Sequence, residues 1–186
     1  MRKQLPVVVV ATALTMFAVF GAGLAAAATT PTGVTDTITM QDVKGKLKFV
    51  APEVVHPGDQ LNIVNETDPK KVGPHTFSLV TKGSLPKTPK ARKSCFTPKH
   101  ICLSISIWHG FDPKTEKISI DPAKAGPPGW STLGSTSKKG DSWFTEKKDE
   151  SFAQEVTADP ATTPTIYFLC AVHPWMQGSV KVQPAA

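Results

Sequence analysis

Three side chains near the end of the chain are spaced so that they can bind one metal ion. Cys170, His173 and Met176 stand at intervals of three residues in the segment Cys-Ala-Val-His-Pro-Trp-Met. Apolar and β-branched runs flank this segment, which predicts a tight loop between two strands that turns a thiol, an imidazole and a thioether toward one point. Thiolate and thioether are soft ligands, and in combination with imidazole they favour copper.

A fourth ligand must come from a distant part of the chain. Two His and one Cys in a plane, with a weak axial Met, form the ligand set of a type 1 (blue) copper site. His75 is the best candidate, because it begins a predicted strand after the turn-rich Gly73-Pro74. A buried structural thiol and a gap-filling methionine would explain Cys170 and Met176 singly, but not the combination. The sequence therefore predicts one type 1 copper ion held by His75, Cys170, His173 and Met176.

This ligand pattern resembles the cupredoxin family of blue copper proteins. The loop is most similar to that of amicyanin, whose C-x-x-H-P-x-M pattern matches Cys170, His173, Pro174 and Met176, and the pair Pro74-His75 resembles plastocyanin. The resemblance covers roughly residues 36–80 and 165–182. It implies a Greek-key β-sandwich in which one ligand His comes early and the Cys–His–Met loop joins the last two strands.

The resemblance also implies roles for the neighbours of the ligands, Pro74, Thr76 and Pro174. The family often has Asn after the first ligand His, where it ties the two ligand loops together and donates a backbone N–H to the Cys sulfur; this chain has Thr76. The second loop His of the family reaches the surface through an apolar patch that serves as the electron port. Pro174 and Trp175 flank His173 here, so Trp175 is either part of that port or an ordinary core side chain.

The remaining pattern favours an all-β fold, the cupredoxin-like Greek-key β-sandwich with a long irregular insertion. Alternating or β-branched runs predict strands, strongest where Leu103, Ile105 and Ile107 alternate with serines. The predicted strands are 36–40, 46–50, 60–65, 75–80, 103–107, 165–170 and 178–183, with a weaker one at 118–120. The only stretch with helical character is 146–158. Residues 84–150 are rich in Pro and Gly and are interpreted as an insertion that carries strand pieces of its own.

The first residues predict export from the cytoplasm. A basic start, Met1-Arg2-Lys3, precedes an apolar run and four alanines, Ala25 to Ala28, which is the pattern of a secretory signal peptide over residues 1–28. The run is long enough that an uncleaved membrane tether through residues 5–28 is the alternative. Residues 29–35 are then a flexible lead and residues 36–186 the cupredoxin-like domain. The expected location is secreted, periplasmic or at the extracytoplasmic cell surface.

Cysteine count and charge agree with an exported protein. Of the three cysteines, Cys95 and Cys102 are close enough in sequence to form a disulfide, which leaves Cys170 for the metal. The formal charge is +6, and removing Arg2 and Lys3 from the 21 basic residues leaves +4. Much of the excess lies in one stretch, which is either a solvated face or a docking patch for an acidic redox partner; its basic residues are Lys82, Lys87, Lys90, Arg92, Lys93 and Lys99. Nucleic acid is not an expected partner outside the cytoplasm.

The ligand set predicts an electron carrier rather than a catalyst. One-electron transfer between a donor and an acceptor protein is the expected function. Two alternatives stay open: an exported copper carrier or buffer, and a metal-free Ig-like interaction domain. A copper-dependent oxidoreductase activity is not excluded, but it needs further ligands that the sequence does not reveal.

Overall fold

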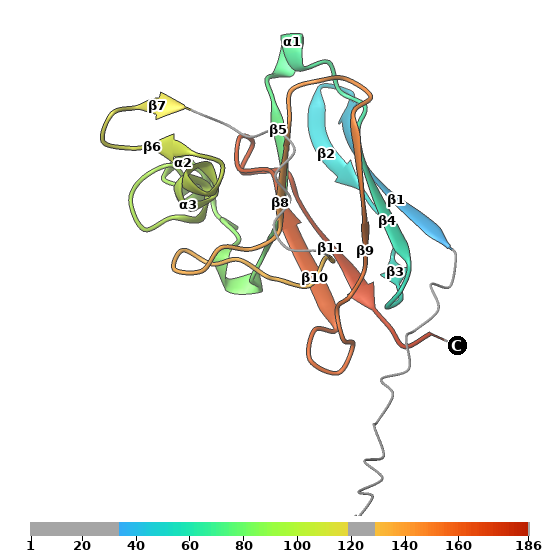
Figure 1. The fold of residues 1–186 in the computed structure, drawn as a ribbon. Helices are drawn as coiled ribbons and strands as arrows, with labels where there is room; N and C mark the ends of the chain where they lie inside the picture. Colours follow the sequence, from blue (N-terminus) through green and yellow to red (C-terminus); the bar gives the residue numbers. More distant parts are fainter. Residues whose placement is uncertain (1–33, 119–128, 186) are drawn as a thin grey trace, which may run out of the picture.

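The computed structural model describes residues 34–118 and 129–185, and within them the chain forms two main β-sheets that pack face to face, besides a small two-stranded sheet (Figure 1). The smaller sheet has the strand order β2-β1-β4-β9 and the larger one β3-β11-β10-β5-β8. The strands are β1 (Thr35–Val43), β2 (Lys46–Val50), β3 (Val54–Val55), β4 (Gln60–Asn65), β5 (His75–Val80), β8 (Ser142–Thr145), β9 (Ser151–Glu155), β10 (Thr165–Leu169) and β11 (Gln177–Val182).

The order of the strands gives the sandwich its topology. β1 pairs parallel with β4, and β3 pairs parallel with β11, while the other pairs in the two sheets are antiparallel. The last two strands, β10 and β11, are antiparallel neighbours in the larger sheet, so the Cys170–Met176 segment is the loop between them. The predicted fold class, an all-β, cupredoxin-like Greek-key β-sandwich, is confirmed.

Every second side chain along the strands points inward, and these side chains fill the space between the sheets. On β5, Phe77 and Leu79 point to this core, and on β10 Ile166 and Phe168 do so. The ring of Phe77 lies 4.7 Å from that of Phe168 and 5.2 Å from that of Trp130, measured between centroids. This core excludes water from the inner face of the larger sheet, where the chain places His75 and Cys170.

A second, smaller group of elements lies against the outer face of the larger sheet, to the left in Figure 1. We call residues 82–118 the insertion lobe. It contains a 3-10 turn η1 (Lys82–Ser84), α2 (Pro89–Lys93), α3 (Ile101–Trp108), β6 (Phe111–Asp112) and β7 (Lys117–Ile118). A separate short helix, α1 (Pro69–Val72), precedes β5. The lobe and the sheet share a small apolar core made of Val80, Cys95, Ile101, Cys102, Ile105, Leu169 and Ala171.

The structure corrects the strongest strand prediction. Residues 103–107 lie in the helix α3. Their alternation is misleading because Ile101 and Ile105, four residues apart, both turn into the small core, while Ile107 is 45% exposed. Ser104 and Ser106 satisfy their hydroxyls by donating to the carbonyls of His100 and Cys102, one turn earlier.

The predicted helical stretch is also wrong. Within 146–158 the chain forms the strand β9, which pairs antiparallel with β4 across five residue pairs. The pairing satisfies the hydrogen bonds of the backbone. Phe152 packs its ring 5.7 Å from that of Trp130, measured between centroids, at the edge of the main core.

Other predictions fall partly outside the described residues. The signal peptide or tether at 1–28 and most of the lead at 29–35 lie outside them, as does the end of the weak strand at 118–120, of which β7 covers only Lys117–Ile118. The stretch interpreted as an insertion, about 84–150, also contains β8, which pairs with β5 at the edge of the larger sheet. Within residues 34–118 and 129–185, no helix is long and apolar enough to cross a membrane.

Candidate metal centre

Two neighbouring segments of the larger sheet bring three candidate ligands together. His75 is the first residue of β5, and its side chain shares the inner face of that strand with Phe77. Gly73, with a φ of 84°, ends α1 by donating its N–H to the carbonyl of Pro69 and so turns the chain into Pro74-His75. Cys170 follows β10 on the inner face, two residues after Phe168.

The loop after Cys170 is closed by its own backbone. The N–H of Cys170 donates to the carbonyl of Met176 at 2.9 Å, and the N–H of Met176 donates to the carbonyl of His173 at 2.8 Å. Gln177 braces the loop from outside, because its side-chain amide donates to the carbonyl of Pro174 at 2.6 Å and to that of Pro86 at 3.0 Å. The loop therefore holds His173 beside Cys170 and keeps Met176 buried in the same core as Cys170.

The ligand atoms of His75, Cys170 and His173 form a compact triangle. The Cys170 Sγ lies 3.7 Å from His75 Nδ1 and 3.6 Å from His173 Nδ1, and the two Nδ1 atoms are 3.2 Å apart. A point at the centre of this triangle is about 2 Å from each atom, comparable to the bonds of about 2.0–2.3 Å that Zn²⁺ makes to imidazole and thiolate. Among the described residues, these three are the one cluster of His, Cys, Asp or Glu side chains with the spacing of a metal site.

Burial sets the protonation states of these groups in the metal-free protein. Desolvation, and then the nearby His173, lowers the pKa of His75 to about 4. Desolvation also lowers the pKa of His173, and a hydrogen bond to the backbone of Val72 offsets part of that effect. Both rings are therefore neutral at pH 7, which is the form that binds a metal through one nitrogen.

The thiol of Cys170 needs the metal in order to ionise. Desolvation raises the pKa of Cys170, and hydrogen bonds from the backbone of Thr76 and from the loop lower it only in part. A bound cation of charge two supplies the compensating positive charge, so that metal binding releases the thiol proton.

The neighbours of the ligands connect the two segments through hydrogen bonds. The backbone N–H of Thr76 donates to the Cys170 Sγ at 3.3 Å, and the Thr76 hydroxyl accepts the N–H of Ala171 at 2.8 Å. Thr76 thus holds the position from which the resemblance expects a donor to the sulfur, with a hydroxyl in place of an amide side chain. Pro74 is half-buried and Pro174 is buried beside the ligands.

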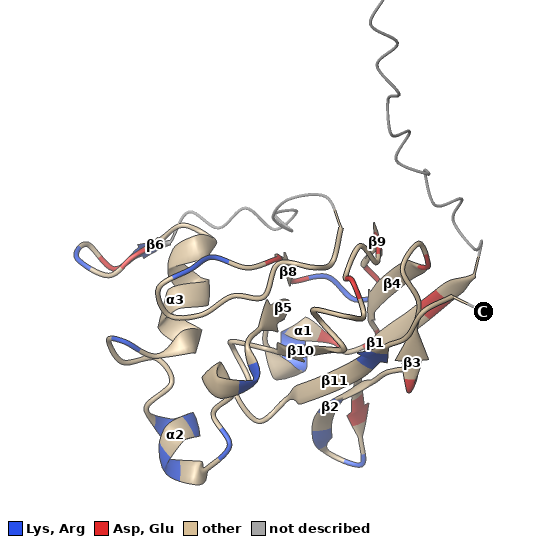
Figure 2. Cartoon of the chain, turned by 90° about the horizontal axis from the view of Figure 1, so that it is seen from below, with Lys and Arg blue, Asp and Glu red and all other residues tan. Residues whose placement is uncertain are grey.

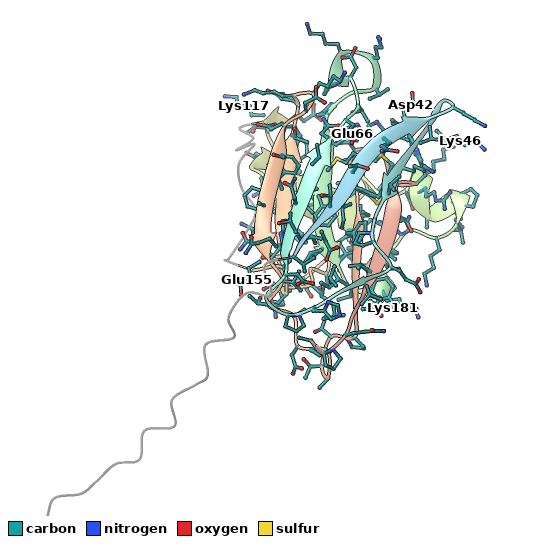
Figure 3. All side chains as sticks on the ribbon, turned by 90° about the vertical axis from the view of Figure 1, so that its right-hand side faces the viewer. Asp42, Lys46, Glu66, Lys117, Glu155 and Lys181 are labelled. Carbon is teal, nitrogen blue, oxygen red and sulfur yellow. A yellow bond between two sulfur atoms is a disulfide. The ribbon has the colours of Figure 1, made fainter. Side chains whose placement is uncertain are left out.

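His173 is the ligand closest to solvent. Its side chain is 8% exposed, whereas His75 and Cys170 are fully buried. Trp175 is 51% exposed and meets the His173 ring edge-on, with 5.2 Å between centroids, so Trp175 is not a core side chain. A groove at this surface is lined by Asp42, Gly45, Lys46, Leu47, Lys48, Val72, His173 and Trp175. Asp42 and Lys46 lie together with Glu66 at one end of the smaller sheet, opposite Glu155 and Lys181 (Figure 3).

The insertion lobe contains the expected disulfide and most of the basic stretch. Cys95 and Cys102 are bonded, with their Cα atoms 5.1 Å apart, and the prediction of this bridge is confirmed. Cys170 is the free cysteine. The basic residues of α2 stand out in blue on the lobe in Figure 2. Sequence reasoning missed Ser78 and Ser142, which are buried because the lobe covers their face of the sheet, and His109, which the lobe brings against Ser142.

Comparisons with known proteins give distant likenesses. No protein-family model matches the sequence, and no curated protein matches it either. Rusticyanin from Thiobacillus ferrooxidans is similar at 18% identity and a TM-score of 0.34, over 81% of this chain and 77% of that one. The multicopper oxidase mgLAC is similar at 16% identity and a TM-score of 0.27, over 83% of this chain and 39% of the oxidase. At these values neither likeness carries a function across.

Proposed function

We propose that the protein is an exported type 1 copper protein that carries single electrons between redox partners. The observation that supports this most directly is the buried triangle of His75 Nδ1, His173 Nδ1 and Cys170 Sγ. Met176, buried in the same core as Cys170, would supply the fourth, weaker ligand. Copper, when bound there, would supply a one-electron couple between Cu(II) and Cu(I).

The chain's own residues prepare the site for this role. The two imidazoles are neutral before the metal arrives, and the sandwich core shields Cys170 from water and oxidants. Thr76 donates a hydrogen bond to the sulfur, which disperses part of the thiolate charge. The disulfide in the lobe fits an oxidising compartment outside the cytoplasm.

Electrons would enter and leave at His173, because it is the ligand with an exposed edge. Trp175 covers that edge and offers an apolar contact to a partner. Lys46 and Lys48 line the same groove and outnumber its one carboxylate, Asp42, so an acidic redox protein is the partner whose charge would complement this surface. Such charges act mainly on the rate of encounter, which falls as salt is added.

The first test is the visible spectrum of the protein after addition of Cu(II), beside a Cys170→Ser variant. We expect an intense band at about 600 nm, from the bond between thiolate and Cu(II), that is absent from the variant. His100→Ala is the matched control, since His100 is exposed and outside the cluster. A colourless protein that binds no copper would leave the Ig-like interaction domain as the explanation of the fold.

A second measurement separates an electron carrier from a copper buffer. The blue protein is cycled with a chemical reductant and oxidant in the presence of a Cu(I) chelator. A carrier keeps its copper, and the band returns in full after reoxidation. Progressive loss of the band into the chelator would instead indicate a protein built to release copper.

A further inference from the structure

The outer face of β5 is polar although it is buried. Thr76 and Ser78 point away from the main core, and Ser142 stands opposite Ser78 in the pairing of β5 with β8. All three are buried, because the insertion lobe covers this face of the sheet. Buried hydroxyls are nearly always hydrogen-bonded, so a polar strip at this position must have partners.

The partners form one continuous chain from the lobe to the ligand loop. His109, which follows α3, places its Nε2 2.7 Å from the Ser142 Oγ. The Ser142 Oγ lies 2.7 Å from the Ser78 Oγ, which donates in turn to the Thr76 Oγ1 at 3.1 Å. The Thr76 Oγ1 also accepts the N–H of Ala171, the residue after Cys170. We call Thr76, Ser78 and Ser142 the hydroxyl chain.

Proton counting gives this chain a direction. A hydroxyl has one hydrogen and two lone pairs. The Thr76 Oγ1 accepts from Ser78 and from Ala171, so its own hydrogen is left to donate. Because Ser78 gives its hydrogen to Thr76, Ser142 must donate to Ser78, and Ser142 must then accept from the Nε2–H of His109.

The Thr76 end of the chain lies next to the sulfur. The backbone N–H of Thr76 donates to the Cys170 Sγ at 3.3 Å, and the Thr76 hydroxyl holds the N–H of Ala171, the residue after Cys170, at 2.8 Å. The surroundings are apolar, since Ile105, Phe111 and Phe144 line a cavity of about 260 Å³ that also touches Thr76 and His109. Hydrogen bonds in such low-dielectric surroundings polarise one another, so a donor at one end strengthens the next along the chain.

We propose that His109 is a positioning residue for the metal centre, acting through the hydroxyl chain of Ser142, Ser78 and Thr76 on the sulfur of Cys170. Its Nε2–H fixes the direction of the hydroxyls, so that the Thr76 hydroxyl accepts from Ser78 and Ala171 and holds Thr76 where its backbone N–H donates to the sulfur. The effect on copper rests on the proposed function: donors at the sulfur favour the more electron-rich Cu(I) state and raise the reduction potential.

The first test uses the metal-free protein and NMR. Long-range ¹H–¹⁵N spectra should place a proton on the Nε2 of His109. In Ser142→Ala the amide proton of Ala171 should move upfield, because the hydrogen bond to Thr76 weakens, and Ser142→Thr, which keeps the hydroxyl, should restore it. An unprotonated Nε2, or an Ala171 amide that ignores Ser142→Ala, overturns the proposal.

The second test measures the reduction potential of the copper-loaded protein. We expect Ser142→Ala and His109→Leu each to lower the ratio of Cu(I) to Cu(II) affinity by about threefold to tenfold. Ser142→Thr and His109→Gln, which keep a donor at each position, should stay within about twofold of the parent protein. His100→Leu is the matched control for removing a histidine, since His100 is exposed. Equal potentials in all variants would overturn the proposal.

The two tests distinguish a failure of the proposed function from a failure of the proposed role of His109. If the parent protein forms no blue site, the proposed function is wrong, and the NMR test still decides whether His109 directs the hydroxyl chain. If the parent protein is blue but Ser142→Ala and His109→Leu leave its potential and the Ala171 amide unchanged, the proposed function stands and the role of His109 is refuted.

Discussion

The candidate metal centre and the insertion lobe lie on opposite faces of the same strand, yet they are built differently. On its inner face β5 carries His75, Phe77 and Leu79 into a core that spans both sheets. On its outer face Val80 joins a much smaller core with the helix α3 and a disulfide. The proposed ligands all come from the sandwich. We therefore expect the sandwich to determine the geometry of the ligands, and the lobe to make only small changes to the properties of the site.

The largest effect that this comparison predicts is in the sandwich core. Phe77→Ala removes a fully buried ring that contacts Phe49, Phe168 and Trp130. We expect a loss of about 3–5 kcal/mol in the free energy of unfolding, measured by chemical denaturation. The matched variant in the lobe, Phe96→Ala, removes a ring that is 48% exposed and should cost less than about 1 kcal/mol. Equal losses of stability in the two variants would contradict this contrast between the sandwich core and the lobe.

The next effect comes from pH acting on His75. The unfolded chain protonates this ring below a pKa of about 6.5, but the folded metal-free protein does so only below about 4. Between these values the unfolded state binds more protons, so stability falls as pH decreases from 6.5 to 4, by up to about 3 kcal/mol.

His75→Gln isolates this contribution. The buried Asp141 acts in the opposite direction, since burial raises its pKa to about 6, and it is present in both proteins. The difference in unfolding free energy between parent and variant should therefore shrink or reverse at low pH in favour of His75→Gln. A difference that is constant from pH 7 to pH 4.5 contradicts the assignment of His75 as a buried neutral ring.

The third prediction concerns the lobe. Replacing Cys95 and Cys102 together by Ala opens a ring of about eight residues, which costs about 2–3 kcal/mol in a chain-entropy estimate. Thermal unfolding followed by circular dichroism should shift to lower temperature. The intense visible band of the copper-loaded protein should remain, because no proposed ligand lies in the lobe. Loss of the band would show that ligand geometry depends on the lobe as well.

The same contrast between the sandwich and the lobe explains which features could be predicted from the sequence. The loop that carries Cys170, His173 and Met176 could be predicted because the three residues are close in sequence, lie between two strand-like runs and have side chains that bind a narrow range of metals. His75 was a weaker candidate that gained its weight mainly from the resemblance, since nothing local links it to residues about 95 positions away. The helix α3 was mistaken for a strand because its burial is decided by a disulfide and by the sheet it covers.

The hydroxyl chain could not be predicted at all from the pattern of β5. Alternation of Phe77 and Leu79 with Thr76 and Ser78 indicates a strand with one solvent face. Only tertiary structure reveals that the lobe buries that face, and that Ser142 and His109, far along the chain, meet it. Polar residues on a strand next to a proposed ligand can therefore be interpreted only when the element that covers them is known.

The brace made by Gln177 has a consequence for the speed of the proposed electron transfer. One amide group holds the carbonyls of Pro174 and Pro86, and so joins the ligand loop to the chain that leads into α2. A loop fixed at both ends by its backbone and clamped from outside can shift little when the charge at its centre changes. A small displacement of this kind means a small reorganisation energy, and the rate at which an electron hops then depends mainly on distance and driving force.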